Sequence, residues 1–346
     1  MAAQDNTALV LEQPTGIGRV VRVNRALRSL PIIPLVILTL LVVTGVFAPL
    51  LAPHNERVGS LADTGIPPFW QGGESILKTV VSDDVFLPAS DKIKLRLALR
   101  SHEGAQVGDQ IEVETKKGGS WTHPLGTDHL GRDILSRVIF GARISLIVAA
   151  VTLGIGGTVG TFLGLVAGYH GGWLDELIMR LVDIKLSIPL ILFALVMVLT
   201  FGQSFEMIVL ILVLYIWPRF ARQIRGEVLQ IRNMDYVSLA KVSGASTWRI
   251  MFRHIFPGTI NTLIVVATLQ VGFVILVEST LSFLGAGVPP PTPAWGSMVA
   301  DGRDFLAVAW WEATIPAIAI FLTVLSLNLF GDWLRDKLDP RLRQLD

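Results

Sequence analysis

The segment from Asp235 to Pro257, DYVSLAKVSGASTWRIMFRHIFP, lies between two long apolar stretches. It predicts two short helices, with Asp235 as the N-cap of the first, Gly244 as its C-terminal turn and Ser246 as the N-cap of the second. Pro257 then marks the start of the next apolar helix. Both short helices carry apolar side chains, namely Tyr236, Val237, Leu239, Trp248, Ile250 and Phe252. Because contiguous exposed apolar surface usually marks a binding site, this hairpin predicts a protein partner.

The sequence around this segment predicts an all-α integral membrane protein. Of the 346 residues, 51% are hydrophobic and 16% are charged, whereas about a quarter are charged in a soluble protein. Six stretches are apolar enough for transmembrane helices, at 32–52, 144–168, 185–201, 206–223, 260–284 and 311–333. The fourth must continue past Arg219 and Arg222, whose side chains are expected to snorkel to the interface. Residues 144–333 would thus form a five-helix core that includes the segment 235–257.

The distribution of cations predicts the orientation. Lysine and arginine concentrate in the N-terminal segment 1–30, in the segment 224–259 and in the tail 334–346. The positive-inside rule therefore places both termini and the hairpin in the cytoplasm, and the loop 53–143 outside. The basic segment 1–30 fits either an amphipathic helix on the inner leaflet or a disordered tail, and 31–52 is the first transmembrane helix.

The loop 53–143 contains a predicted β element over 90–116. Polar and apolar residues alternate over 92–100 and again over 110–114, and a period of two is typical of half-buried strands. We therefore expect a small extracytoplasmic β-containing insertion. The alternative is an irregular insertion without a role.

Several polar residues lie inside the predicted spans. Gln270 and Glu278 fall in the fifth span and Asn328 in the sixth. Polar and ionisable residues in a membrane must face protein or water, so these three are candidates for the translocation path. Glu278 should face either the cavity or an interhelical partner.

Other features of the spans indicate packing and interfaces. Glycines recur every fourth residue in the second span, at Gly156, Gly160, Gly164 and Gly168, a spacing that favours close helix packing. Trp310 and Trp311 are typical of an interfacial aromatic belt.

Several other functions find no support. The net charge of +1 gives no basis for nucleic-acid binding, and the absence of cysteine excludes thiol chemistry. No phosphate-binding loop of the GxxxxGK[ST] type is present, so the chain is not expected to be an enzyme that hydrolyses ATP. His123 and His129 flank Asp128, but their spacing does not bring them together, and no metal site is predicted.

Three further motifs, in order along the chain, establish a family resemblance. They are HPLGTDHLGRD at 123–133, LSFLG at 281–285 followed by PPPTPAWG at 289–296, and DKLDPR at 336–341. Together with the hairpin, they resemble the permease subunits of binding-protein-dependent ABC importers, specifically the C-type subunit of the dipeptide/oligopeptide (nickel) transporter family. The resemblance covers about 120–346 and the first span, and leaves out 56–118. At the Glu-Ala-Ala triplet of that family this chain has Ser238, Leu239 and Ala240, so the glutamate is missing. The glycine of the signature is Gly244, and the ending is Ile255-Phe256-Pro257.

The resemblance implies a type I importer fold and a role for the hairpin as the coupling helix that sits in a cleft of an ATPase. The coupling residues it suggests are Asp235, Tyr236, Val237, Leu239, Ala240, Gly244, Ala245, Trp248, Ile255 and Pro257. It further implies a B-type permease partner, two ABC ATPase subunits that carry ATP and Mg, an extracytoplasmic binding protein, and location in a bacterial cell membrane. No cofactor would be bound by this chain itself.

The implied function is to form half of a translocation pathway for peptides. The alternatives are import of a nickel complex or an oligosaccharide by the same architecture, or a secondary transporter or channel. A membrane scaffold or receptor that signals through its hairpin is a third reading.

Overall fold

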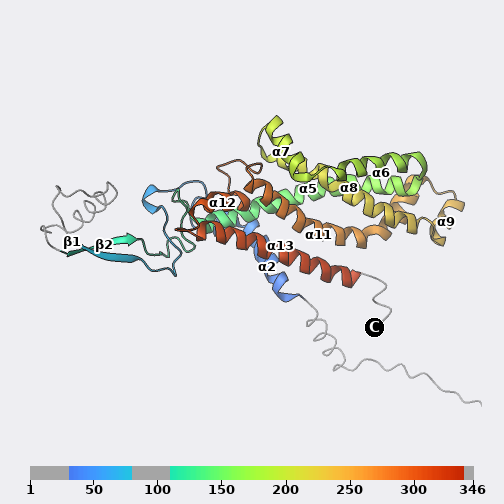
Figure 1. The fold of residues 1–346 in the computed structure, drawn as a ribbon. Helices are drawn as coiled ribbons and strands as arrows, with labels where there is room; N and C mark the ends of the chain where they lie inside the picture. The colour runs from blue at the N-terminus through green and yellow to red at the C-terminus, as the bar shows by residue number, and fades with distance from the viewer. Residues whose placement is uncertain (1–30, 80–109, 339–346) are drawn as a thin grey trace, which may run out of the picture.

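The computed structural model describes residues 31–79 and 110–338, which form an elongated bundle of long helices (Figure 1). Its helices before the hairpin are α2 (Ile32–Val46), α3 (Ala48–Leu51), η1 (Leu61–Asp63), α5 (Ile134–His170), α6 (Gly172–Ser187), α7 (Leu190–Phe201) and α8 (Phe205–Ile231). They are followed by α9 (Asp235–Val242), α10 (Thr247–Arg249), η2 (Ile250–Ile255), α11 (Phe256–Phe283), α12 (Trp295–Gly302), η3 (Arg303–Phe305) and α13 (Trp311–Leu338). The two strands are β1 (Glu74–Thr79) and β2 (Gln110–Lys116).

Within residues 31–79 and 110–338, four helices are long and apolar enough to cross a membrane. They are α5, α8, the continuous helix Thr247–Phe283 and α13. A fifth span results if α6 and α7 are counted as one broken span, and α2 is a shorter apolar helix. The described part of the chain is therefore mostly helical, with four to five apolar spans of full length, as the sequence indicates in outline.

The predicted single helix over 185–201 is wrong. Helix α6 ends at Ser187, α7 begins at Leu190, and the two axes are bent by 84°. Pro189 explains the break because it has no N–H to donate and forces the residue before it out of the helical region. Ile188 is accordingly extended, with φ −85° and ψ 123°.

The start of α5 differs from the sequence prediction, whereas the end of α8 agrees with it. Helix α5 begins at Ile134 rather than at 144, because the Asp133 side chain accepts a hydrogen bond from the Ser136 backbone N–H and caps the helix there. Helix α8 continues through Arg219 and Arg222 to Ile231, as expected.

The glycines of α5 bring it into close contact with α8, which confirms the packing predicted from their spacing. A Cβ atom at Gly164 would lie 2.6 Å from the Ala221 carbonyl oxygen, and one at Gly168 would lie 2.7 Å from the Val228 Cβ. Without a hydrophobic force between helices in lipid, such close backbone approach supplies the packing energy. Helix α5 also contacts α2, α6 and α11 and is the central element of the bundle.

Strands β1 and β2 pair antiparallel in a two-stranded sheet that lies beyond the end of the bundle (Figure 1). Strand β2 contains the stretch 110–114 that was predicted as a strand. Its partner β1 was not predicted, and the other expected strand, over 92–100, lies outside the described residues.

The bundle has two ends of different character. One end, here called the α12 end, carries α12, the segment 123–133 and the start of α13 (Figure 1). The opposite end, the α9 end, carries α9 and α10 (Figure 1). A core cluster of α5, α8, α11 and α13 residues connects to the α12 end, and a second cluster lies under α9.

Candidate coupling segment and membrane-buried polar residues

The turn at the α9 end is fixed by Gly244. The Ala245 N–H donates to the Ala240 carbonyl at 3.1 Å, and the Gly244 N–H donates to the Lys241 carbonyl at 3.0 Å. This pair of bonds is the Schellman motif, which requires a left-handed residue after the helix. Gly244 has φ +75°, a conformation that costs little only for glycine. The predicted turn is confirmed.

Neither predicted N-cap of the hairpin is made by a side chain. Met234 occupies the N-cap position of α9, and Asp235 instead lies in the first turn, where its negative charge favours the positive end of the helix dipole. Ser246 does occupy the N-cap position of α10, but its side chain makes no capping hydrogen bond.

One face of the hairpin is buried against the bundle. Val237, Ile250 and Ile255 are almost completely buried and pack with Leu165 of α5 and with residues of α8. The expectation that Val237 and Ile250 are exposed is therefore wrong, because the helical period turns them toward α5 and α8. Ala240 and Ala245 are partly buried against the same cluster. These residues anchor the hairpin to the spanning helices.

The other face is apolar and exposed. Leu239 is 66% exposed and Val242 is 87% exposed, and Tyr236, Trp248 and Phe252 are also exposed. The Trp248 ring stacks on Phe252, with ring centroids 5.7 Å apart. Val242 was not among the predicted coupling residues, although its spacing of three from Leu239 places both on one helix face.

The hairpin joins α11 without a break. Thr247 to Phe283 form one continuous 37-residue helix, of which Ile250–Ile255 is π-helical. Pro257 lies in the first turn of α11 and cannot donate the usual backbone hydrogen bond to the preceding turn. A π-turn next to it keeps the helix continuous. A displacement of the hairpin therefore acts directly on α11.

Glu278 is buried between α11 and α5. Its Oε1 accepts from the Ser282 hydroxyl at 2.7 Å, and its Oε2 accepts from the Ser145 and Ser279 hydroxyls at 3.4 Å each. Of the two predicted positions for this side chain, the structure places it against an interhelical partner. The three hydroxyls satisfy a carboxyl group that has no contact with solvent.

The other two translocation candidates lie in different surroundings. Asn328 is exposed and lines a largely apolar cavity of about 510 Å³ with residues of α11, α12 and α13. Gln270 is buried and its Oε1 accepts from Arg219 Nη1 at 3.3 Å. Arg219 thus reaches across to α11 and does not extend toward an interface, contrary to the prediction from sequence.

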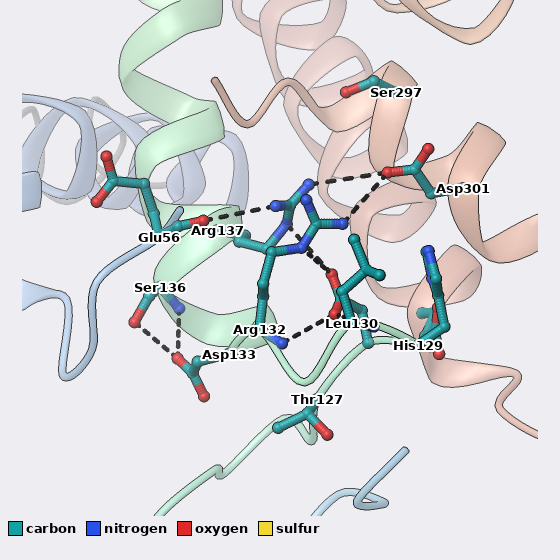
Figure 2. Close-up of polar contacts among 12 residues, drawn as sticks. Glu56, Thr127, His129, Leu130, Arg132, Asp133, Ser136, Arg137, Ser297 and Asp301 are labelled. Carbon is teal, nitrogen blue, oxygen red and sulfur yellow. Dashed lines mark hydrogen bonds and ion pairs between the residues drawn. The ribbon is translucent and has the colours of Figure 1, made fainter. Parts of the chain in front are cut away.

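The segment 123–133 forms a charged network at the α12 end (Figure 2). Asp128 accepts from the Leu130 and Arg132 backbone N–H groups at 2.9 Å and from Arg132 Nε at 2.6 Å. Arg137 Nε lies 3.8 Å from the same carboxylate. Asp301 of α12 contacts both guanidinium groups, at 3.5 Å and 3.9 Å. The network joins the start of α5 to α12.

Histidines at this end have separate partners. His129 Nδ1 lies 3.1 Å from Glu312 Oε2 of α13, whereas His123 Nδ1 lies 3.0 Å from Asp133 Oδ1. Potential ligand atoms of His54, His123 and Asp133 lie within 4.8 Å of one another, a grouping that the sequence did not reveal because His54 is distant along the chain. Asp133 Oδ2 also accepts from the Ser136 N–H and hydroxyl, so hydrogen bonding around the α5 cap accounts for this group.

The tryptophans of this end connect the family motifs to one another. Trp311 is buried and donates from Nε1 to the Thr127 carbonyl at 3.0 Å, which corrects its assignment to an interfacial belt. Trp295 Nε1 donates to the Val138 carbonyl at 2.9 Å. The motifs at 123–133 and 289–296 are therefore parts of one packed structure.

An exposed apolar hairpin on a continuous spanning helix fits the transport permease class, and a family match supports this class. The family described as binding-protein-dependent transport system inner membrane component matches residues 160–344. The chain belongs to this family and is a permease of an ABC importer.

Relatives support the same assignment. The glutathione transport system permease protein GsiD of Pectobacterium atrosepticum is 43% identical over 227 residues, which cover 66% of this chain and 75% of the relative. GsiD of Escherichia coli O6:K15:H31 is 44% identical over 226 residues, which cover 65% of this chain and 75% of the relative.

Two solved transporter structures are also similar to part of this chain. The inward-facing methionine ABC transporter MetNI is 16% identical, with a TM-score of 0.48 over 59% of this chain and 96% of that chain. An amino acid ABC transporter with histidines is also 16% identical, with a TM-score of 0.46. The match covers 59% of this chain and 94% of that chain.

Proposed function

We propose that this chain forms half of the translocation pathway of an ATP-driven importer of peptides. The substrate class is supported by the relatives, which are named as glutathione transport permeases and are 43–44% identical to this chain over the 226–227 aligned residues. A single helical chain encloses only part of a pathway, so a second permease of the B-type completes it. Two separate ABC ATPase subunits bind ATP and Mg, and an extracytoplasmic protein delivers the peptide.

The proposed topology has six transmembrane segments. They are α2, α5, the bent pair α6–α7, α8, the helix Thr247–Phe283 and α13. The cation distribution places both chain termini and the α9 end in the cytoplasm. The α12 end and the sheet of β1 and β2 then lie outside the membrane, where a binding protein arrives.

The observation that carries the proposal is the exposed apolar face of the hairpin on a helix continuous with α11. Tyr236, Leu239, Val242 and Trp248 contact the ATPase cleft in this account. The buried residues of the predicted set, among them Val237, Ile255 and Ala240, transmit the movement because they fix the hairpin to α5 and α8.

The proposed mechanism is rocking of packed helices about an interface. Closure of the ATPase subunits on ATP displaces the hairpin, and the continuous helix through Pro257 carries that displacement into α11. Glu278 holds α11 against α5, while Gln270 and Asn328 contribute to the path along α11 and α13. The cavity then opens outward and reverses after hydrolysis.

Reconstitution tests this proposal. The complete complex in proteoliposomes, with its binding protein, should accumulate radiolabelled glutathione or trialanine when ATP is supplied. An assembly with ATPases unable to hydrolyse ATP is the control and should accumulate neither. If the active complex hydrolyses ATP but concentrates neither peptide, the assignment of peptides as substrates is wrong.

A further inference from the structure

Arg219 of α8 is partly buried and lies against α11. Its guanidinium carbon is 4.0 Å from the centre of the Phe273 ring and 5.1 Å from that of Tyr215. It also bonds to Gln270, which lies at the midpoint of the 28-residue helix α11. A helix of that length is about 42 Å long, so this contact is roughly 20 Å from either end. In the proposed topology, in which α8 and α11 both span the membrane, the charge therefore lies within the membrane.

Arg219 differs from the next two arginines of α8 in its partners. Arg222 pairs with Asp183, and Arg225 pairs with both oxygens of Asp175, one of them at 2.7 Å. Arg219 bonds only to neutral oxygens, at 3.3 Å to Gln270 and 3.4 Å to the Tyr215 hydroxyl. Within residues 31–79 and 110–338 no carboxylate pairs with it.

An arginine so placed has an unused capacity to bind an anion. A guanidinium has about five N–H donors, and two long bonds to neutral groups leave several unused. The side chain is only partly buried in this chain. The bonds to Gln270 and Tyr215 use one N–H on each terminal nitrogen, so Nε–H and the second N–H of each terminal nitrogen are not used by them. Such a set of donors can bind a carboxylate through two parallel hydrogen bonds. A cation at this depth is costly without such a partner.

We propose that Arg219, held by Tyr215, Gln270 and Phe273, binds the C-terminal carboxylate of the peptide during its passage through the membrane. This inference rests on the proposed function and names a specificity-determining residue for it. A lipid phosphate does not fit this position, because headgroups lie about 15 Å or more from the midplane. A peptide in transit brings a carboxylate to this depth.

Direct binding tests the assignment without the binding protein. The complete complex is placed in nanodiscs, and equilibrium binding is measured for the radiolabelled peptide, glutathione or trialanine, that the wild type accumulates with ATP. The same peptide with its C-terminal carboxylate converted to an amide is measured in parallel. We expect the wild type to bind the acid about tenfold or more tightly than the amide, about 1.4 kcal/mol.

The variants separate recognition from structure. Arg219→Gln should bind the acid as weakly as the amide, with its affinity for the amide unchanged. Arg219→Lys should retain part of the preference for the acid, because it keeps the positive charge but lacks the paired N–H donors of a guanidinium. Arg222→Gln, whose own carboxylate partner is Asp183, should keep the full preference.

Three results would overturn the assignment. They are equal binding of acid and amide by the wild type, an unchanged preference in Arg219→Gln, and an equal loss of both ligands in that variant. The last result would mean that Arg219 only holds α8 against α11 or pairs with the second permease chain. Failure of the proposed function is a separate outcome, because the wild type would then accumulate neither peptide in proteoliposomes.

Discussion

The two ends of the bundle present opposite surfaces. At the α12 end, Asp128, Arg132 and Arg137 are buried and satisfied by one another and by the backbone (Figure 2). At the α9 end, Leu239 and Val242 are apolar side chains that the described part of the chain leaves exposed. A charge network is therefore enclosed at the α12 end, while apolar side chains of the hairpin are exposed at the α9 end.

This difference indicates separate tasks for the two ends. A satisfied charge network costs much to disturb. This network holds the start of α5 to the end of α12, and the His129–Glu312 contact adds the start of α13. An exposed apolar face gains energy only when a partner covers it. We infer that the α12 end is a fixed frame and that the α9 end receives force.

The largest effect is expected at the α12 end, from Asp128→Ala. This change leaves Arg132 and Arg137 buried with only the half-exposed Asp301 as a counterion, and removing one partner of a buried ion pair costs about 3–5 kcal/mol. The yield and thermal midpoint of the purified complex should fall sharply. Asp301→Ala is the matched control and should cost much less. Similar losses for both variants would contradict a network centred on Asp128.

At the α9 end, Leu239→Glu should impair transport without unfolding the protein. The side chain is exposed, so a charge there does not disturb the core, but it would face the apolar cleft of the partner. We expect ATP-driven uptake in proteoliposomes to fall about tenfold, about 1.4 kcal/mol in coupling. Leu239→Met conserves volume and polarity and should retain near-normal uptake. Normal uptake by the glutamate variant would show that Leu239 does not contact the partner.

A comparable effect, on stability and not on uptake, is expected from Gly244→Ala in the same hairpin. No atom lies within 4 Å of the Cβ position, so the cost comes only from φ +75°, roughly 1–2 kcal/mol for a residue with a side chain. The thermal midpoint of the complex should fall accordingly. Gly226→Ala in α8 has the same free space without a positive φ, and helix propensity favours it by up to about 1 kcal/mol. Equal midpoints for the two variants would refute the backbone explanation.

The smallest effect is expected from Arg303→Ala, also at the α12 end. Arg303 pairs with its neighbour Asp304 at 3.3 Å, and both side chains are largely exposed. Exposed pairs contribute about 0–1 kcal/mol, so stability should change by less than about 0.5 kcal/mol. A drop comparable to that of Asp128→Ala would show that exposure does not separate the two sets of charges.

Sequence patterns predicted the features that depend on local chemistry. The turn at Gly244 follows from the need for a left-handed residue, and the glycine face of α5 follows from a spacing of four. The continuation of α8 past Arg219 was also predicted from length alone. Each of these features is determined by residues close together in the chain.

Features that depend on distant residues were missed. The apolar character of Val237 and Ile250 is the same whether they face a partner or Leu165, so composition alone placed them on the wrong face. Phe273 and Gln270, the partners of Arg219 on α11, are distant from it in sequence, and snorkelling was the outcome predicted from its own helix. Trp311 is buried because Thr127, far away in sequence, accepts its N–H.

The central claim is that the α9 end, and not the α12 end, contacts the ATPase. The natural chain has no cysteine, so a single Leu239→Cys can carry a photoactivatable cross-linker in the assembled complex. Leu130→Cys is the matched position, because Leu130 is an exposed leucine of the α12 end. The account predicts a cross-linked permease–ATPase product from position 239 and none from position 130. A product from position 130, or its absence at 239 in a complex that is assembled and active, would contradict it.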